Sequence, residues 1–166
     1  MLGTETYMVQ ARRDQLERSR WYAGGFLLTF LATSEETRGR FMLVEEVGGK
    51  GVSSNPPLHL HTREEESFYV IEGEMTFYLG DTTIHAGPGA FITLPRGIPP
   101  TWVVESETLR LLNMCVPGGF DGFLRELSVP VDALTPPPPA DGPPDVERLV
   151  ATAARYGVEI VGPPPA

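Results

Sequence analysis

The spacing of turns between residues 26 and 116 limits this chain to a small set of folds. Short apolar segments rich in strand-forming residues recur there, and turns such as Gly80-Asp81 and Gly87-Pro88-Gly89 separate them at intervals of about 8–12 residues. None of these segments has the spacing of a long helix. The pattern predicts an all-β antiparallel fold of about ten strands, a double-stranded β-helix or jelly roll. The expected strands include 26–31 and 41–47, which should form a hairpin, then 67–71, 75–79, 82–86, 91–94, 101–104 and 109–116.

Composition excludes several classes of partner. The 166 residues carry a formal net charge of −9, whereas nucleic acids and anionic membranes are bound by clustered Lys and Arg. No window approaches the roughly 18 consecutive apolar residues of a membrane-spanning helix, and the N-terminus does not resemble a signal peptide. Cys115 is the only cysteine and lies in an apolar run, so we expect a buried thiol rather than a disulfide. We therefore expect a cytoplasmic protein with no nucleic-acid or membrane partner.

Changes in composition divide the chain into four segments. Residues 1–20 are a polar lead-in, and residues 21–128 are expected to hold the barrel and a short helix over 120–127. Residues 129–144 are a proline-rich linker, which should be stiff and extended. Residues 145–166 form a C-terminal appendage.

This C-terminal appendage is expected to dock on the barrel. Residues 145–156 have helical spacing, with prolines before the start and Gly157 as the stop signal. Residues 158–161 are expected to add an edge strand. The apolar stripe that should face the barrel consists of Val146, Leu149, Val150 and Ala153.

The stretch from His59 to Gly73 carries the chemistry. Two histidines that are two residues apart on a strand point their rings to the same side, roughly 6–7 Å apart, close enough to share one metal ion. A third ligand has to come from another strand, and Glu66 is the natural donor. Because the interval from His61 to Glu66 is odd, an unbroken strand would point them to opposite faces. We therefore expect a turn over residues 62–65 and a hairpin that brings Glu66 back to the histidines.

This stretch resembles the first motif of the cupin superfamily. His59, His61, Glu66 and Gly73 match its pattern of His-x-His, four residues, Glu, six residues and Gly. The resemblance covers roughly residues 40–116, and the tail is similar to that of small single-domain cupins of the quercetin 2,3-dioxygenase-like type. It implies a cupin barrel with one divalent metal ion (Fe, Mn, Ni, Zn or Cu) held by His59, His61 and Glu66.

The second cupin motif is matched only in part. Gly89, Pro95 and Gly97 fit it, but Pro100 stands where the family has its fourth ligand, a histidine. The remaining histidine, His85, is expected to point outward from its strand. Two hypotheses follow: the three remaining residues bind a metal, or the metal has been lost and they form a hydrogen-bonded polar cluster.

Two aromatic residues are candidates for the wall of a substrate pocket. Trp102 shares the strand parity of Pro100, and Phe68 shares that of Glu66. Both are equally well interpreted as core residues, because aromatic side chains fill the interior of small barrels.

Three polar residues near this site have simpler interpretations. Glu64 and Glu65 are expected in a solvated turn, although Glu65 would replace Glu66 if the turn were one residue shorter. Asn113 is interpreted as a core or edge amide whose hydrogen bonds are satisfied. None of the three is predicted to contact substrate.

We expect the chain to act on a small organic molecule. The first hypothesis is a dioxygenase-like enzyme for an aromatic or enolisable substrate, in which Glu66 is both a metal ligand and the catalytic base. The alternatives are a non-oxidative cupin cyclase or isomerase, and a metal-free binding protein. The resemblance also implies a homodimer, with strand edges before residue 40 available for exchange between subunits.

Overall fold

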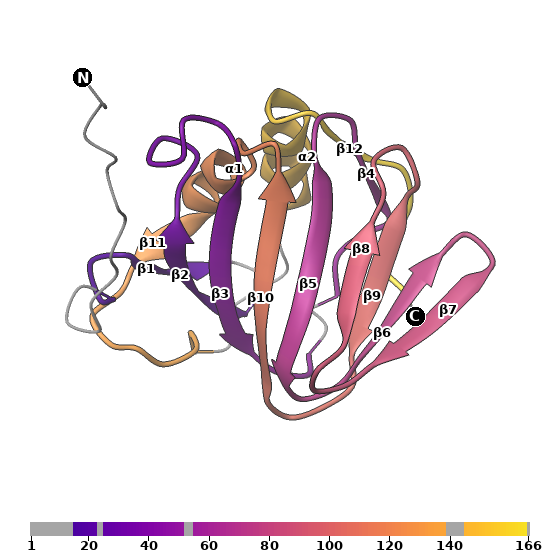
Figure 1. The fold of residues 1–166 in the computed structure, drawn as a ribbon, viewed down its shortest axis with the longest axis horizontal. Helices are drawn as coiled ribbons and strands as arrows, with labels where there is room; N and C mark the ends of the chain where they lie inside the picture. Colours follow the sequence, from indigo (N-terminus) through magenta and orange to yellow (C-terminus); the bar gives the residue numbers. More distant parts are fainter. Residues whose placement is uncertain (1–14, 23–24, 52–54, 139–144, 166) are drawn as a thin grey trace, which may run out of the picture.

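Strands dominate the computed structural model, which describes residues 15–22, 25–51, 55–138 and 145–165 (Figure 1). The prediction of an all-β jelly roll is confirmed. The elements are β1 (Ser19–Tyr22), β2 (Phe26–Ala32), β3 (Met42–Gly48), β4 (His59–His61), β5 (Glu65–Glu72), β6 (Met75–Leu79), β7 (Thr82–Ala86), β8 (Phe91–Leu94), β9 (Pro100–Val104), β10 (Leu109–Val116), α1 (Asp121–Glu126), β11 (Ser128–Pro130), α2 (Val146–Arg155) and β12 (Val158–Ile160).

The largest sheet has seven strands in the order β11-β1-β2-β3-β10-β5-β8. Every neighbouring pair in it is antiparallel. The predicted hairpin is present as β2 and β3, with Phe30 opposite Val44. Figure 1 shows the outer face of this sheet, and both helices lie behind it.

The second layer consists of two smaller sheets, β12-β4 and β7-β6-β9. Strand β4, which carries both histidines, pairs with β12, so that His61 lies opposite Val158 and His59 opposite Ile160. The expected hairpin between the histidine strand and β5 is therefore wrong. The turn after His61 instead carries the chain from one layer to the other, because β5 pairs with β10 and β8 in the large sheet.

The core lies between the layers and is built by strict alternation. In β10, Leu109, Leu111 and Cys115 point inward and are at most 1% exposed, whereas Arg110 and Val116 point outward. The largest fully buried side chains include three phenylalanines from different strands, namely Phe30, Phe68 and Phe77. The expected burial of the Cys115 thiol is confirmed.

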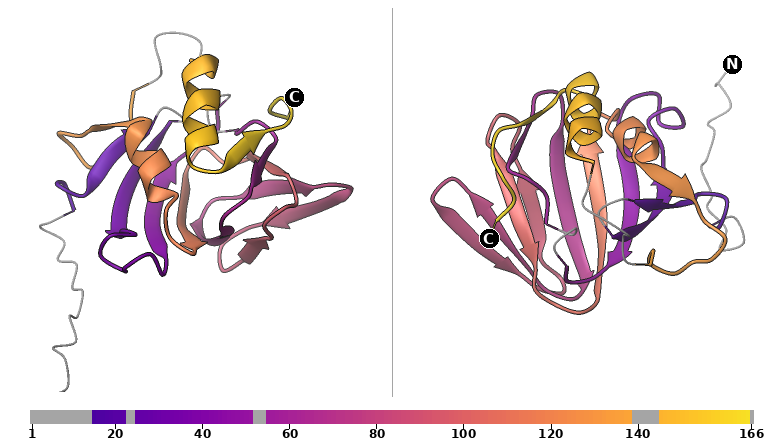
Figure 2. Two further views of the ribbon diagram at one scale, coloured as in Figure 1. Left: turned by 90° about the horizontal axis from the view of Figure 1, so that it is seen from above. Right: turned by 180° about the vertical axis from the view of Figure 1, so that it is seen from behind.

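Helix α2 lies beside β12, and helix α1 lies between α2 and β11 (Figure 2). Helix α1 lies within the predicted range of 120–127. Helix α2 begins after Asp145, whose carboxylate accepts a hydrogen bond from the Arg148 N–H at 2.9 Å. The predicted apolar stripe is only half right, because Val146 and Val150 are 59% and 43% exposed. The helix turns a narrower face inward, centred on the fully buried Ala153.

Two short strands were not predicted. β1 begins inside the expected lead-in, and β11 begins at the last residue of the expected barrel segment and runs into the expected linker. The two strands pair with each other, with Trp21 opposite Val129. Their pairing is reinforced by Arg20, which donates hydrogen bonds to the Ser128 hydroxyl and carbonyl, both at 2.8 Å. Strands of three or four residues are too short to show a period-2 pattern. Within the described residues, neither helix has the length and hydropathy needed to cross a membrane.

Candidate metal centre

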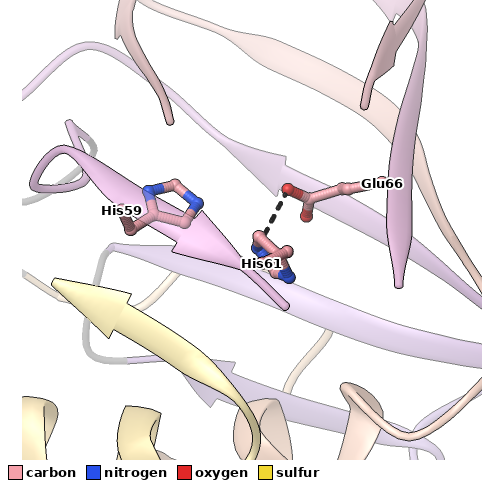
Figure 3. A group of neighbouring side chains, drawn as sticks. All are labelled: His59, His61 and Glu66. Atoms are coloured by element: carbon pink, nitrogen blue, oxygen red, sulfur yellow. Dashed lines mark ion pairs between the residues drawn. The ribbon is translucent and has the colours of Figure 1, made fainter. Parts of the chain in front are cut away.

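Three side chains converge inside the barrel, two from β4 and one from β5 (Figure 3). One ligand atom from each of His59, His61 and Glu66 lies within 4.8 Å of the other two. All three residues are buried, with exposed fractions of 6%, 5% and 2%. The structure thus brings together the same three residues that the spacing singled out.

Both histidines present the same ring nitrogen to the centre. The Nδ1 of His59 lies 2.9 Å from the Pro57 carbonyl oxygen, and the Nδ1 of His61 lies 2.6 Å from a carboxylate oxygen of Glu64. Each acceptor fixes the proton on Nδ1, which leaves the Nε2 lone pair free to bind a cation.

Two atoms of this centre lack hydrogen-bond partners. The Nε2 of His61 and the Oε2 of Glu66 are buried and lie 3.5 Å apart, which is the distance of an ion pair when His61 is protonated (Figure 3), but neither atom makes a hydrogen bond in the described parts of the chain. Buried polar atoms without a partner are costly. A divalent cation between them would satisfy both, and two imidazoles with one carboxylate are a donor set that suits such an ion. The residues present therefore fit a metal ion.

Glu64 is not a solvated turn residue, contrary to the sequence-based prediction. It is 2% exposed and holds His61 through Nδ1. The turn folds back on the preceding strand, so a carboxylate three residues after the histidine reaches its ring. Glu65, in contrast, is exposed as predicted and cannot replace Glu66.

Glu66 is held from its other side by an amide. The Nδ2 of Asn113, on β10, donates to the Oε1 of Glu66 at 2.8 Å and to the Oε1 of Glu46 at 3.0 Å. Asn113 is 3% exposed, which agrees with its interpretation as a satisfied core amide. Glu46 points from β3 to the same interior side.

The electrostatics of the two histidines differ. Burial lowers the pKa of His59 to about 4, with a further contribution from the charge of His61. Burial would also lower the pKa of His61, but the hydrogen bond with Glu64 and the charges of Glu66 and Glu64 outweigh it and raise that pKa. His59 is therefore neutral at pH 7, whereas His61 has a stronger tendency to hold a proton.

The pKa values of two carboxyl groups at the centre, Glu66 and Glu46, are raised above the usual value for glutamate. Burial raises the pKa of Glu66, although the charge of His61 and the hydrogen bond from Asn113 oppose it. Burial and the charge of Glu66 raise the pKa of Glu46 to about 7. A cation at the centre would bind the ionised form of Glu66 and the neutral form of the histidines, so its binding would release protons and weaken in acid.

Aromatic rings enclose the centre. Trp102 packs edge-on to His59 with ring centroids 5.5 Å apart, and Phe120 packs in the same way on His61 at 4.8 Å. Phe68 contacts Trp102 at 5.2 Å and is itself 1% exposed in the core. Pro100 is buried two residues before Trp102 on β9, so the side that carries the fourth ligand in the family is apolar here.

Sequence reasoning missed three residues of this centre. Glu46 carried a usable signal, because it shares strand parity with the buried Met42 and Val44 and so had to face the interior. For Glu64 and Phe120 the sequence held no such signal, since one lies in a turn and the other follows a turn.

The third histidine lies outside the centre, as predicted. His85 is exposed on β7, and its Nδ1 lies 3.0 Å from the hydroxyl of Thr76. That hydroxyl donates to Glu105 at 2.7 Å. His85 is therefore a natural control residue for the two buried histidines.

Comparisons with known proteins agree with this geometry. Residues 45–116 match the Cupin domain family. The chain is 30% identical over 116 residues to quercetin 2,3-dioxygenase of Bacillus subtilis (strain 168), an alignment that covers 70% of this chain and 34% of that protein. The chain thus spans about a third of the length of this relative.

Solved structures show the same barrel. The polyketide cyclase RemF from Streptomyces resistomycificus is 28% identical, with a TM-score of 0.52 over 66% of this chain and 80% of that one. Ectoine synthase from P. lautus has a TM-score of 0.59 at 20% identity, over 84% of this chain and 97% of that one, which is a likeness of fold alone. The motif, the barrel and the matched residues lead to one assignment: residues 45–116 form a cupin domain, and the chain is similar in sequence to quercetin 2,3-dioxygenase.

Proposed function

We propose that this protein is a metal-dependent cupin enzyme of the dioxygenase-like kind, which acts on a small aromatic or enolisable organic substrate. His59, His61 and Glu66 would hold one divalent ion. The observation that carries the proposal is the pair of buried, unpartnered atoms, His61 Nε2 and Glu66 Oε2, that face each other beside His59 in the described chain.

A bound divalent ion would act as a Lewis acid toward an enolate or phenolate oxygen and, if it is redox-active, would support oxygen chemistry. The protein's own residues bind, orient and exclude water. Trp102, Phe68 and Phe120 supply apolar rings that suit a flat organic molecule. With Pro100 in place of a fourth ligand, a three-residue donor set leaves room for a substrate oxygen beside it.

Glu66 is the group that we propose as the catalytic base. Its Oε2 faces the centre without a hydrogen-bond partner among the described residues, and burial raises its pKa. A carboxylate with a raised pKa is a better proton acceptor at neutral pH than a surface carboxylate. In this role Glu66 Oε2 would leave the ion and take a proton from the substrate, while Oε1 keeps its hydrogen bond to Asn113.

Elemental analysis of the purified protein tests the proposal. Near-stoichiometric metal in the native chain should vanish in His59→Ala and persist in the matched control His85→Ala, which removes an exposed histidine. Pro100→His should increase the affinity by restoring a fourth donor. If the native chain binds no metal and Pro100→His does, the cluster is a polar remnant and the protein is a metal-free binding module.

A non-oxidative cyclase or isomerase is the second candidate. The observation in its favour is the 28% identity with a protein named as a polyketide cyclase. Turnover of candidate aromatic polyketides under strictly anaerobic conditions distinguishes the two. Loss of turnover without oxygen supports the dioxygenase, whereas an equal rate supports the cyclase.

We also propose that the protein is a homodimer. The outer face of the large sheet aligns Leu112 with Tyr69 and Tyr69 with Phe91, and the last two are 44% and 61% exposed. Such an apolar row on three neighbouring strands is suited to a self-complementary contact. Sedimentation velocity should give a dimer for the native chain and a monomer for Phe91→Glu, with Val146→Glu on α2 as the control. A native monomer would refute this.

A further inference from the structure

One amide joins two carboxylates beside the candidate metal centre. Asn113 lies at the middle of β10, opposite Val44 on β3 and Phe68 on β5. Its Nδ2 lies 2.8 Å from Glu66 Oε1 and 3.0 Å from Glu46 Oε1. An amide nitrogen carries two hydrogens, so each carboxylate can accept one.

The chemistry of the neighbours determines the orientation of this amide. The other end of the group, Oδ1, lies 3.8 Å from the Sγ of Cys115, which can donate a weak hydrogen bond to it. Burial raises the pKa of the Cys115 thiol, so it keeps its proton. A flipped amide would place its oxygen against two carboxylates and its N–H groups against the thiol. Both hydrogen bonds to the carboxylates would then be lost.

We propose that Asn113 is a positioning residue that turns Glu66 so that only Oε2 meets the metal, and that Glu46 locks Asn113 in place. The inference rests on the proposed metal site. The two oxygens of Glu66 are in different situations. Oε1 accepts a hydrogen bond from the amide, whereas Oε2 accepts none from the described residues and faces His61 Nε2 at 3.5 Å.

This arrangement matters because the donor set is small. With Pro100 where the family has a histidine, three side chains must hold the ion, and a carboxylate that is free to rotate could bind through both oxygens or swing away. The hydrogen bond from Asn113 to Oε1 restricts that rotation and leaves Oε2 as the oxygen that faces the ion. Groups that orient a metal ligand in this way commonly contribute about 10- to 100-fold to affinity.

Titration with Co²⁺, followed by the visible absorption of the bound ion, tests this role. The chains to compare are the native protein, Asn113→Leu, Asn113→Ser, Glu46→Leu and Glu46→Gln. We expect a Kd about 10- to 100-fold higher and an altered absorption band for the first three variants. Glu46→Gln should stay close to native, because its side-chain carbonyl can still accept from Asn113.

The outcomes separate the inference from the proposed function. If Asn113→Leu and Asn113→Ser keep the native Kd and spectrum while their metal-free forms melt at lower temperature, Asn113 is structural and the inference fails while the metal site stands. If Glu46→Gln is as damaging as Glu46→Leu, Glu46 does not act through this hydrogen bond. If the native chain binds no Co²⁺, the proposed metal site fails and takes the inference with it.

Discussion

Replacing Glu46 by glutamine should change how the stability of the metal-free protein depends on pH. Burial and the charge of Glu66 raise the pKa of Glu46 from 4.5 to about 7 in the folded chain. Between these two pH values the folded state holds a proton on Glu46 that the unfolded state has lost. Stability conferred by this group therefore falls as the pH rises from 4.5 through 7.

The expected magnitude follows from that difference in pKa. Each unit of difference in pKa corresponds to about 1.4 kcal/mol, so the difference between 4.5 and about 7 corresponds to about 3 kcal/mol of unfolding free energy. The native chain loses this contribution of Glu46 as the pH rises, and Glu46→Gln does not. The size of the side chain is unchanged, and its carbonyl still accepts from Asn113. The variant should therefore gain about 3 kcal/mol relative to the native chain between pH 4.5 and pH 8.

Urea denaturation in the presence of a chelator, at pH 4.5, 6, 7 and 8, measures this gain. Glu45→Gln is the matched control, because it removes the same charge from the outer face of the same strand, where Glu45 pairs with Arg110 at 2.7 Å. A difference between Glu46→Gln and native that is the same at pH 4.5 and pH 8 would refute the reasoning.

Three further predictions concern the site and its frame. Glu64→Gln should weaken Co²⁺ binding about tenfold, because the ring of His61 loses its carboxylate partner; unchanged affinity in a titration would exclude this role. Gly73→Ala should lower the unfolding free energy more than Gly89→Ala. The two glycines have nearly the same φ, +86° and +88°, so the backbone strain is similar. A Cβ at Gly73 would lie 2.2 Å from a backbone carbonyl oxygen, whereas a Cβ at Gly89 would have no atom within 4 Å. Equal losses in urea would contradict that difference. His59 by itself should contribute a loss of up to about 3 kcal/mol as the pH falls from 6.5 to 4, because its pKa is lowered to about 4 in the folded chain. His59→Asn should therefore gain up to about 3 kcal/mol relative to the native chain over this range, and a difference between the two that does not change with pH would contradict it.

Much of the fold was predictable because its signals are local. Turn residues and strand periodicity located the barrel strands, and the spacing of His59, His61 and Glu66 identified the cluster. Asn113 was predicted to be a core or edge amide, and the structure places it in the core. Helix α2 was located by its end signals, but the face it turns inward was not, since Val146 and Val150 have the spacing of a buried stripe and remain exposed.

Two errors concern the pairing of the histidine strand and the burial of Glu64. The histidine strand was expected to pair with the strand that follows it, yet it pairs with β12, about 100 residues later. Glu64 was assigned to solvent because a run of glutamates is usually solvated, and it is buried because His61 offers it a partner. The pairing with β12 is not visible in a local window, and the burial of Glu64 depends on the barrel that packs around this turn.

The sequence by itself determined the all-β class, the metal-binding residue types and the absence of the fourth histidine, because these follow from periodicity and identity along the chain. Tertiary structure alone decided which oxygen of Glu66 faces the centre, which groups hold the two imidazoles, and which rings enclose them. The physical reason is that burial and hydrogen bonding depend on what a side chain meets across the barrel. Glutamate is common on surfaces, yet Glu64 and Glu46 become part of this centre. The reason is that Glu64 hydrogen-bonds to His61 and Glu46 accepts a hydrogen bond from Asn113.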